Sequence, residues 1–194
     1  MIQRALLLID LQRSFCAPDG IVARQGHDIG AMTTAARRCA RYAARARAAG
    51  IEVIWTRIGW AADYSDGGRL IAVQRPNLAR IGALKRGSDD HAIVPVAGYV
   101  DGEMIIDKTR FSALTNAYMI EHLMRQSIDT VFVAGVTTSM CVESTVRDLA
   151  ERDYSITVLA DGCADFTPDS HQASLRAHGF GFATIYPPNA DPPF

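Results

Sequence analysis

The feature that most restricts the fold of this chain is a regular alternation of short apolar runs with amphipathic segments. The first apolar run, at 5–9, is continuous and ends at Asp10. Further short runs cover 51–56, 104–107, 130–134, 156–160 and 182–185. Strands that are buried on both faces have this continuous apolar pattern. Between the runs, apolar residues at helical spacing predict helices at about 29–49, 116–126, 141–153 and 170–178.

Strands that alternate with helices predict a parallel sheet with right-handed crossovers and helices on both faces. We therefore predict an α/β fold with a mainly parallel sheet of about six strands. The 194 residues, 48% of them hydrophobic, suit a single domain, which we expect over 1–194. The stretch 57–102 is rich in Gly, Pro and Asp and has weak periodicity, so we interpret it as a long excursion that shapes a site.

Charge and the N-terminal sequence argue against several classes of partner. Twenty basic and 21 acidic residues give a net charge of −1, so no overall field favours nucleic acid or an acidic membrane. The arginines at 37–47 alternate with apolar residues at helical spacing, which is typical of a solvent-facing helix side. The first apolar run is too short for a signal sequence or a membrane span. We therefore predict a cytoplasmic protein whose partner is a small molecule.

The four cysteines are widely spaced and include no CxxC pair, which argues against structural zinc and against a disulfide framework. Free cysteine is most often a buried packing residue, and we assign that role to Cys16, Cys39 and Cys163. Cys141 differs because it lies where a predicted strand turns into a predicted helix. Its position alone leaves both a packing role and a nucleophilic role open.

Reactive side chains follow three of the predicted strands. Asp10 closes the first, Lys108 follows the third, and Cys141 comes a few residues after the fourth. Ligands of open α/β sheets bind beyond the carboxyl ends of the strands, so we expect these residues on one rim. A helix N-terminus and a lysine ammonium both favour a thiolate, and Asp10 can accept the thiol proton. The three residues together predict a nucleophilic cysteine site.

Motifs of nucleotide and cofactor chemistry are absent from the sequence. No GxGxxG loop follows the first predicted strand, and no GxxxxGK[ST] loop occurs. The histidines all lie away from the predicted strand ends: His27, His91, His122, His171 and His178. Their placement argues against a Cys-His protease site. We predict that the protein uses no cofactor.

Three segments resemble, in order and spacing, the active-site segments of the isochorismatase-like cysteine hydrolases: LLLIDLQRSF, DKTRFSAL and GVTTSMCVESTVRDLAERDY. The resemblance extends over nearly the whole chain. It implies a three-layer α/β/α fold of Rossmann-like topology and a catalytic triad of Asp10, Lys108 and Cys141. It also implies a cis peptide between Val136 and Thr137, and an oxyanion hole formed by the amides of Thr137 and Cys141.

The same resemblance implies a reaction in which Cys141 attacks an amide or ureido carbonyl, Asp10 takes the proton and water hydrolyses a thioester. Nicotinamidases of this family bind a metal through an Asp-x-His pattern and a second His after the second strand. This chain has no His between Gly50 and Asp90, so we predict no metal, which argues against pyridine carboxamides as substrates. Isochorismatases proper lack the cysteine, so its presence here argues against vinyl ether cleavage.

The stretch Gly59-Trp60, followed by Tyr64, is similar to that of family members that act on ureido compounds such as biuret or ureidoacrylate. Trp60 and Tyr64 are therefore candidate substrate contacts, with loop packing as the equal alternative. Phe15 and Phe111 follow the Asp and Lys segments and are further candidates for the pocket wall, with a place in the core as the alternative for either.

We therefore predict a metal-independent cysteine amidohydrolase that releases ammonia or an amine from a small amide, carbamoyl or ureido compound. The alternatives are a vinyl ether hydrolase of isochorismatase type and a non-catalytic relative that binds a small molecule or senses redox state through Cys141. Relatives commonly assemble, so we expect a homo-oligomer, either a dimer or a tetramer.

Overall fold

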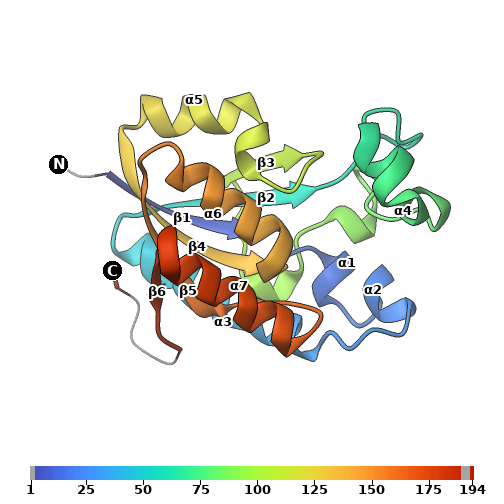
Figure 1. The fold of residues 1–194 in the computed structure, drawn as a ribbon, viewed down its shortest axis with the longest axis horizontal. Coiled ribbons are helices and arrows are strands. Elements are labelled where there is room, and N and C mark those ends of the chain that lie inside the picture. Colours follow the sequence, from blue (N-terminus) through green and yellow to red (C-terminus); the bar gives the residue numbers. More distant parts are fainter. Residues whose placement is uncertain (1–2, 189–192) are drawn as a thin grey trace.

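Six parallel strands form the central sheet of the computed structural model, which describes residues 3–188 and 193–194 (Figure 1). The strands are β1 (Gln3–Ile9), β2 (Glu52–Ile58), β3 (Met104–Lys108), β4 (Ile128–Val136), β5 (Ser155–Ala164) and β6 (Thr184–Tyr186). The helices are α1 (Arg13–Cys16), α2 (Ile21–Arg24), α3 (Gly30–Ala48), α4 (Pro76–Arg80), α5 (Ala117–Arg125), α6 (Glu143–Ala150) and α7 (Pro168–Gly181). The predicted α/β fold with about six parallel strands is confirmed.

The strand order β3-β2-β1-β4-β5-β6 reverses direction between β1 and β4. The chain runs outward from β1 to β3, and then outward on the other side from β4 to β6. Right-handed crossovers place the helices of the two halves on opposite faces, and α3 lies on one face while α5, α6 and α7 lie on the other (Figure 1). Ligands of such sheets bind at the reversal, beyond the carboxyl ends of the strands.

The two strands at the reversal lie close together because β4 carries a glycine there. Gly135 pairs with Ile9 and has a φ of +131°, and a Cβ at this position would lie 2.1 Å from the Ile9 carbonyl oxygen. A side chain at Gly135 would therefore push β1 and β4 apart at the edge where Asp10 follows β1. The apolar run 5–9 is fully buried, as its continuous pattern predicts.

We expect Gly135→Ala to lower the free energy of unfolding by about 3–5 kcal/mol, since the atom that its Cβ meets belongs to backbone and cannot rotate away. Denaturant unfolding followed by circular dichroism measures the loss. Gly50→Ala is the matched control, because Gly50 also has a positive φ, +67°, but a Cβ there meets nothing within 4 Å. The control is expected to lose only about 1 kcal/mol. Equal losses in both variants would contradict the steric argument.

β4 and β5 are longer than the sequence predicts. β4 continues through Gly135 and Val136, and β5 continues past Ala160 to Ala164. The second half of β5 escaped the pattern because it contains Asp161, a charged residue inside a strand. Arg38 Nη1 donates to this carboxylate at 2.7 Å and the Tyr42 hydroxyl also donates to it, so the half-buried charge has partners within the protein.

Arg37, Arg41 and Arg45 of α3 are exposed, as the sequence predicts, but two other arginines of the range 37–47 also bind the rest of the fold and correct the prediction in part. Arg38 pairs with Asp161 of β5, and Arg47 donates from Nε to Glu103 at 2.7 Å and from Nη2 to the Gly98 carbonyl at 2.8 Å. Both arginines are half-buried. They therefore fasten α3 to the sheet and to the segment before β3.

The segment between β2 and β3 is the predicted long excursion, and it contains α4 and short helical turns. These turns cover Leu70–Gln74, Asp89–His91 and Pro95–Ala97. The buried Gln12 side chain fastens the excursion to the strand ends, since its Nε2 donates to the carbonyls of Ile58 and His91, each at 3.0 Å. No helix in the described part of the chain has the length and apolar content needed to cross a membrane.

Candidate active site

Asp10, Lys108 and Cys141 lie together at the reversal of strand order, on the rim where the sequence places them. Asp10 follows β1 directly, Lys108 ends β3, and Cys141 lies between β4 and α6. The Lys108 Nζ donates to Asp10 Oδ2 at 2.6 Å, and the Cys141 thiol lies against both groups. All three residues are buried, with exposures of 0%, 3% and 6%. The arrangement places a thiol, a carboxylate and an ammonium in mutual contact.

The lysine reaches the aspartate across an intervening strand. β3 is separated from β1 by β2, and neighbouring strands lie about 4.8 Å apart, so the two backbones are roughly 10 Å apart. The long, flexible stem of Lys108 spans this gap and carries its ammonium to Asp10. Its Nζ also donates to the Arg110 carbonyl at 3.2 Å.

Thr56 lies on β2, the strand between β1 and β3, and is a residue of this site that was not identified from the sequence. Its hydroxyl donates to Asp10 Oδ1 at 2.6 Å and accepts from the Asp10 amide at 3.2 Å. Asp10 itself has a φ of +50°, a conformation that is uncommon outside glycine, asparagine and aspartate. A polar residue near the end of an otherwise apolar strand was the signal that could have revealed Thr56. The two hydrogen bonds fix the orientation of the carboxylate.

The charge state of Lys108 follows from two opposing effects. Burial lowers the pKa of its amine, but the neighbouring groups raise it by more, chiefly the Asp10 carboxylate through its negative charge and through the hydrogen bond that it accepts from Nζ. The pKa of Lys108 is therefore raised above its ordinary value, and the group is an ammonium at neutral pH.

The Cys141 thiol is protonated at rest, which differs from the thiolate that the sequence favours. Burial is the largest effect and raises the pKa of Cys141, and the Asp10 carboxylate raises it further. Lys108 lowers this pKa without reversing the shift. The sequence indicated that the Lys108 ammonium lies near the thiol, but it did not indicate how deeply the thiol is buried. The thiol therefore needs a base when it attacks, and the carboxylate beside it is suited to that role.

A well-anchored turn carries Cys141. After β4 the chain forms a π-helical turn over Thr138–Val142 and continues into α6, as expected for a strand-to-helix junction. The Thr145 hydroxyl donates to the Cys141 carbonyl at 2.7 Å, and the Ser139 amide donates to Asp165 Oδ2 at 2.6 Å. The peptide bond between Val136 and Thr137 is cis, at the position that the family resemblance indicates.

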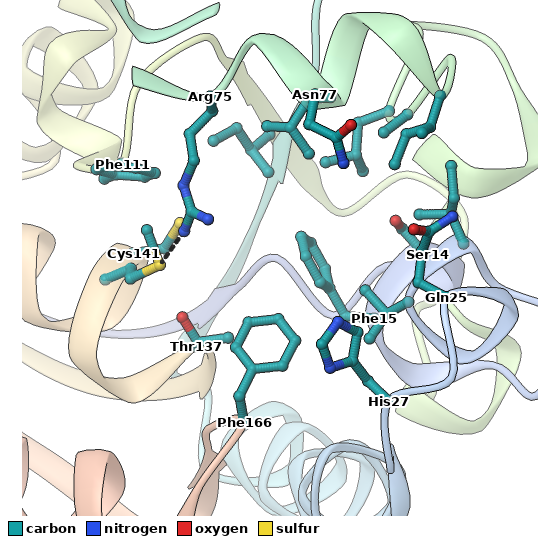
Figure 2. Close-up of a pocket in the computed structure, with 18 of the residues that line it drawn as sticks. Ser14, Phe15, Gln25, His27, Arg75, Asn77, Phe111, Thr137, Cys141 and Phe166 are labelled. Carbon is teal, nitrogen blue, oxygen red and sulfur yellow. Dashed lines mark hydrogen bonds between the residues drawn. The ribbon is translucent and has the colours of Figure 1, made fainter.

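A small cavity of about 210 Å³ opens beside Cys141 and is lined mostly by apolar and aromatic side chains (Figure 2). Its volume is enough for several waters or for one small molecule. Phe15, Trp60 and Phe111, three of the predicted substrate contacts, line this cavity. Thr137, the predicted partner of Cys141 in an oxyanion hole, also lines it.

Tyr64 is not among the residues that line the cavity, which corrects its predicted role as a substrate contact. Its hydroxyl donates to the Ala83 carbonyl at 2.7 Å, and its ring centroid lies 6.3 Å from that of Trp60. Tyr64 therefore packs behind Trp60 and supports the loop. This is the packing role that the sequence left open as the alternative.

Several cavity residues come from segments without a usable sequence pattern. Arg75 and Asn77 lie at the start of α4, His27 lies between α2 and α3, and Phe166 lies between β5 and α7. Aperiodic loop segments contain no signal that assigns their side chains to a cavity, because their course depends on contacts with the rest of the fold.

Two histidines depart from the prediction that all five lie away from the strand ends. His27 lines the cavity, and the buried His91 lies with its Nε2 3.5 Å from Asp107 Oδ1 of β3. Burial is the main cause of a lowered pKa for His91. The His91 ring is therefore neutral at neutral pH and lies beside β3. The histidines are distant from the strand ends along the sequence, as predicted, but the fold brings these two close to the site.

The residues after β2 do not suit the metal site of the nicotinamidases. Asp63 accepts hydrogen bonds from the amide and the hydroxyl of Ser65, at 3.1 and 2.8 Å. Asp66 pairs with Arg86 at 2.6 Å and accepts from the Ala61 amide at 2.9 Å. Within 3–188 and 193–194, no group of three or more His, Cys, Asp or Glu side chains is arranged to hold a metal ion.

The fold and this cluster define a hydrolase class, and the chain belongs to the isochorismatase family. The model of the isochorismatase domain matches residues 4–185. A ureidoacrylate amidohydrolase RutB from Methylobacterium radiotolerans is 33% identical over 182 residues, which cover 88% of this chain and 70% of that relative. A second protein of the same name, from Methylorubrum extorquens, is 32% identical over 86% of this chain and 72% of its own length. The predicted family is confirmed.

A solved structure leads to the same class. A cysteine hydrolase from Pseudomonas syringae pv. phaseolicola has a TM-score of 0.83 at 26% identity, covering 94% of this chain and 87% of that chain. The similarity confirms the expected isochorismatase-like α/β fold. The protein is thus a hydrolase of the isochorismatase family.

Proposed function

We propose that the protein is a cysteine amidohydrolase that cleaves a C–N bond of a small ureido, carbamoyl or amide compound. The observation that carries the proposal is the buried Asp10–Lys108 ion pair in contact with the Cys141 thiol at the wall of a small cavity. The ureidoacrylate amidohydrolases at 32–33% identity support the same reaction class. They favour it over vinyl ether cleavage and over a non-catalytic binding role.

The first half of the proposed reaction forms a thioester. Asp10 accepts the thiol proton as Cys141 Sγ attacks the carbonyl carbon, so a C–S bond forms and the carbonyl π electrons move to oxygen. We assign the amides of Thr137 and Cys141 to the resulting oxyanion. Lys108 holds the Asp10 carboxylate in place and balances its charge. As the tetrahedral intermediate collapses, the C–N bond breaks and the leaving nitrogen takes the proton from Asp10.

The second half of the proposed reaction regenerates the thiol. Asp10 accepts a proton from water as the water oxygen attacks the thioester carbon, and the C–S bond then breaks. The proton returns to the Cys141 sulfur. The products are ammonia or an amine in the first half and a carboxylate or carbamate in the second.

The test is ammonia release from a panel of small ureido and amide compounds, with and without prior thiol alkylation. We expect at least one compound to release ammonia and alkylation at Cys141 to stop the release. Mass spectrometry of the enzyme quenched during turnover should show an acyl or carbamoyl adduct on Cys141. Pyruvate from isochorismate without ammonia from any amide would replace the proposal by ether hydrolysis.

We expect turnover to be independent of added metal, because the acidic side chains after β2 already bind protein donors and the described residues contain no group of three or more His, Cys, Asp or Glu placed to hold a metal ion. Prolonged dialysis against a strong chelator should leave the rate within about a factor of two of the untreated enzyme. Loss of activity on chelation, restored by zinc or iron, would contradict this prediction.

The remaining expectations from the sequence belong to this proposal. We propose a single-domain enzyme of the cytoplasm that assembles as a dimer or tetramer.

A further inference from the structure

The cavity beside Cys141 has an uneven distribution of charge. Among its described lining residues, Arg75 is the side chain with a permanent charge, and no aspartate or glutamate is present. The other polar groups of the lining are neutral hydroxyl and amide groups and the imidazole of His27. The Asp10 carboxylate nearby is balanced by Lys108. A ligand in this cavity therefore meets one uncompensated positive charge.

Local sequence places the Arg75 side chain at the cavity. Arg75 lies between the helical turn at Leu70–Gln74 and α4, and Pro76 follows it. A residue before proline is disfavoured in helical conformation, and Arg75 has φ −134° and ψ 49°. The helical path therefore breaks at this residue, and its side chain projects from the break toward Cys141 (Figure 2).

The guanidinium has little to bind within the protein. Its Nη2 lies 3.3 Å from the sulfur of Met140, the residue before Cys141, and a thioether is only a weak acceptor. The ion pairs found among the described residues do not include Arg75. Arg75 is exposed, so its guanidinium is solvated at the edge of this mostly apolar cavity, where a carboxylate can replace water with two parallel hydrogen bonds.

We infer that Arg75 binds a carboxylate of the substrate and selects ureido or amide acids over neutral amides. The inference rests on the proposed function and deepens it by naming the substrate class. Because Met140 adjoins Cys141 and contacts the guanidinium, the substrate carboxylate lies only a few bonds from the carbonyl that is attacked. The planar fork of arginine matches a carboxylate with two parallel hydrogen bonds. Arg75 is thus a specificity residue rather than part of the proton transfer.

A pair of alkylating reagents tests this inference without knowledge of the natural substrate. Iodoacetate and iodoacetamide both alkylate thiols and differ in a carboxylate that replaces an amide. We expect Arg75→Gln to lower the ratio of their rates at Cys141 about tenfold or more, because only iodoacetate gains from the guanidinium. Arg75→Lys keeps the charge without the fork and should give an intermediate ratio. Peptide mass mapping separates Cys141 from the other cysteines.

Arg80→Gln is the matched control, since Arg80 is an exposed arginine at the end of α4 that does not line the cavity. The variant removes the same net charge, so its rate ratio should stay within about a factor of two of the wild type. A ratio unchanged by Arg75→Gln, or lowered equally by Arg80→Gln, would overturn the inference while the proposed function stands. The proposed function fails separately, and this inference with it, if the wild-type protein releases ammonia from none of the ureido and amide compounds of the panel.

A substrate pair gives a second readout. 3-Ureidopropionate and 3-methylbutylurea have the same shape, but a carboxylate in the first is replaced by an isopropyl group in the second. We expect Arg75→Gln to raise KM for the acid about ten- to a hundredfold, with a smaller change in kcat and little change for the neutral urea. Equal effects on both compounds would indicate a structural role and would overturn the inference.

Discussion

Cys141→Ala is expected to lower ammonia release at least about a thousandfold while the protein stays folded. The variant loses the atom that forms the covalent bond, and removal of a nucleophile costs several orders of magnitude in comparable enzymes. The fold should be nearly unaffected, because the thiol lies at a cavity wall and its removal leaves no large void in the core. Steady-state ammonia assays and thermal unfolding measure the two effects.

Cys39→Ala is the matched control for this variant. Cys39 is also a fully buried free cysteine, but its thiol donates to the Gly162 carbonyl at 3.2 Å and it is not part of the cavity lining. We expect it to lose about 1 kcal/mol of stability and to keep the wild-type rate. A Cys141→Ala protein that retains more than about a tenth of the rate, equivalent to less than 1.4 kcal/mol of barrier, would rule out the covalent mechanism.

Asp10→Asn is expected to lower the rate at least about a thousandfold and also to destabilise the protein. The amide has nearly the shape of the carboxylate but cannot accept the thiol proton, so the resting thiol is not activated. The substitution also leaves the Lys108 ammonium buried beside a neutral group. Loss of one partner of a buried ion pair lowers stability by about 3–5 kcal/mol. Loss of the neighbouring carboxylate should also lower the pKa of Lys108, since Asp10 is its main raising influence.

The double variant Asp10→Asn/Lys108→Met separates catalysis from stability. Replacing Lys108 by methionine removes the orphaned charge and keeps an unbranched side chain, so we expect the double variant to be more stable than Asp10→Asn alone. Its rate should remain as low as that of the single variant. If activity returned together with stability, Asp10 would act through the fold and not through proton transfer.

The reactive residues were predictable because all the strands of a parallel sheet end at the same edge, so residues that follow different strands come together there. A polar residue at the end of a buried strand, or shortly after it, lies at the rim, which is why Asp10, Lys108 and Cys141 were identified from a linear pattern. Thr56 lies inside β2, two residues before its end, and was missed because a threonine there resembles an ordinary strand residue. The extension of β5 beyond Ala160 was missed because Asp161 is balanced by partners from α3, which no local pattern reveals.

Cavity residues were only partly predictable. Phe15 and Phe111 follow rim residues closely in the sequence, so their places are nearly fixed by those of Asp10 and Lys108. Trp60 and Tyr64 are four residues apart in one loop, yet one lines the cavity and the other packs behind it. The direction of a side chain in an irregular loop depends on the surfaces that the loop meets, and not on a repeating backbone period.

The sequence by itself determined the order of strands and helices, the rim on which the reactive groups lie and the family of the protein, because burial patterns and motifs are local properties of the chain. Only the tertiary structure decided the charge states and the shape of the cavity. Lys108 meets Asp10 from 98 positions away, and Arg75 meets Met140 from 65 positions away. Burial and charge act through space, so whether the thiol rests protonated and whether a free guanidinium faces it depend on residues that only folding brings together.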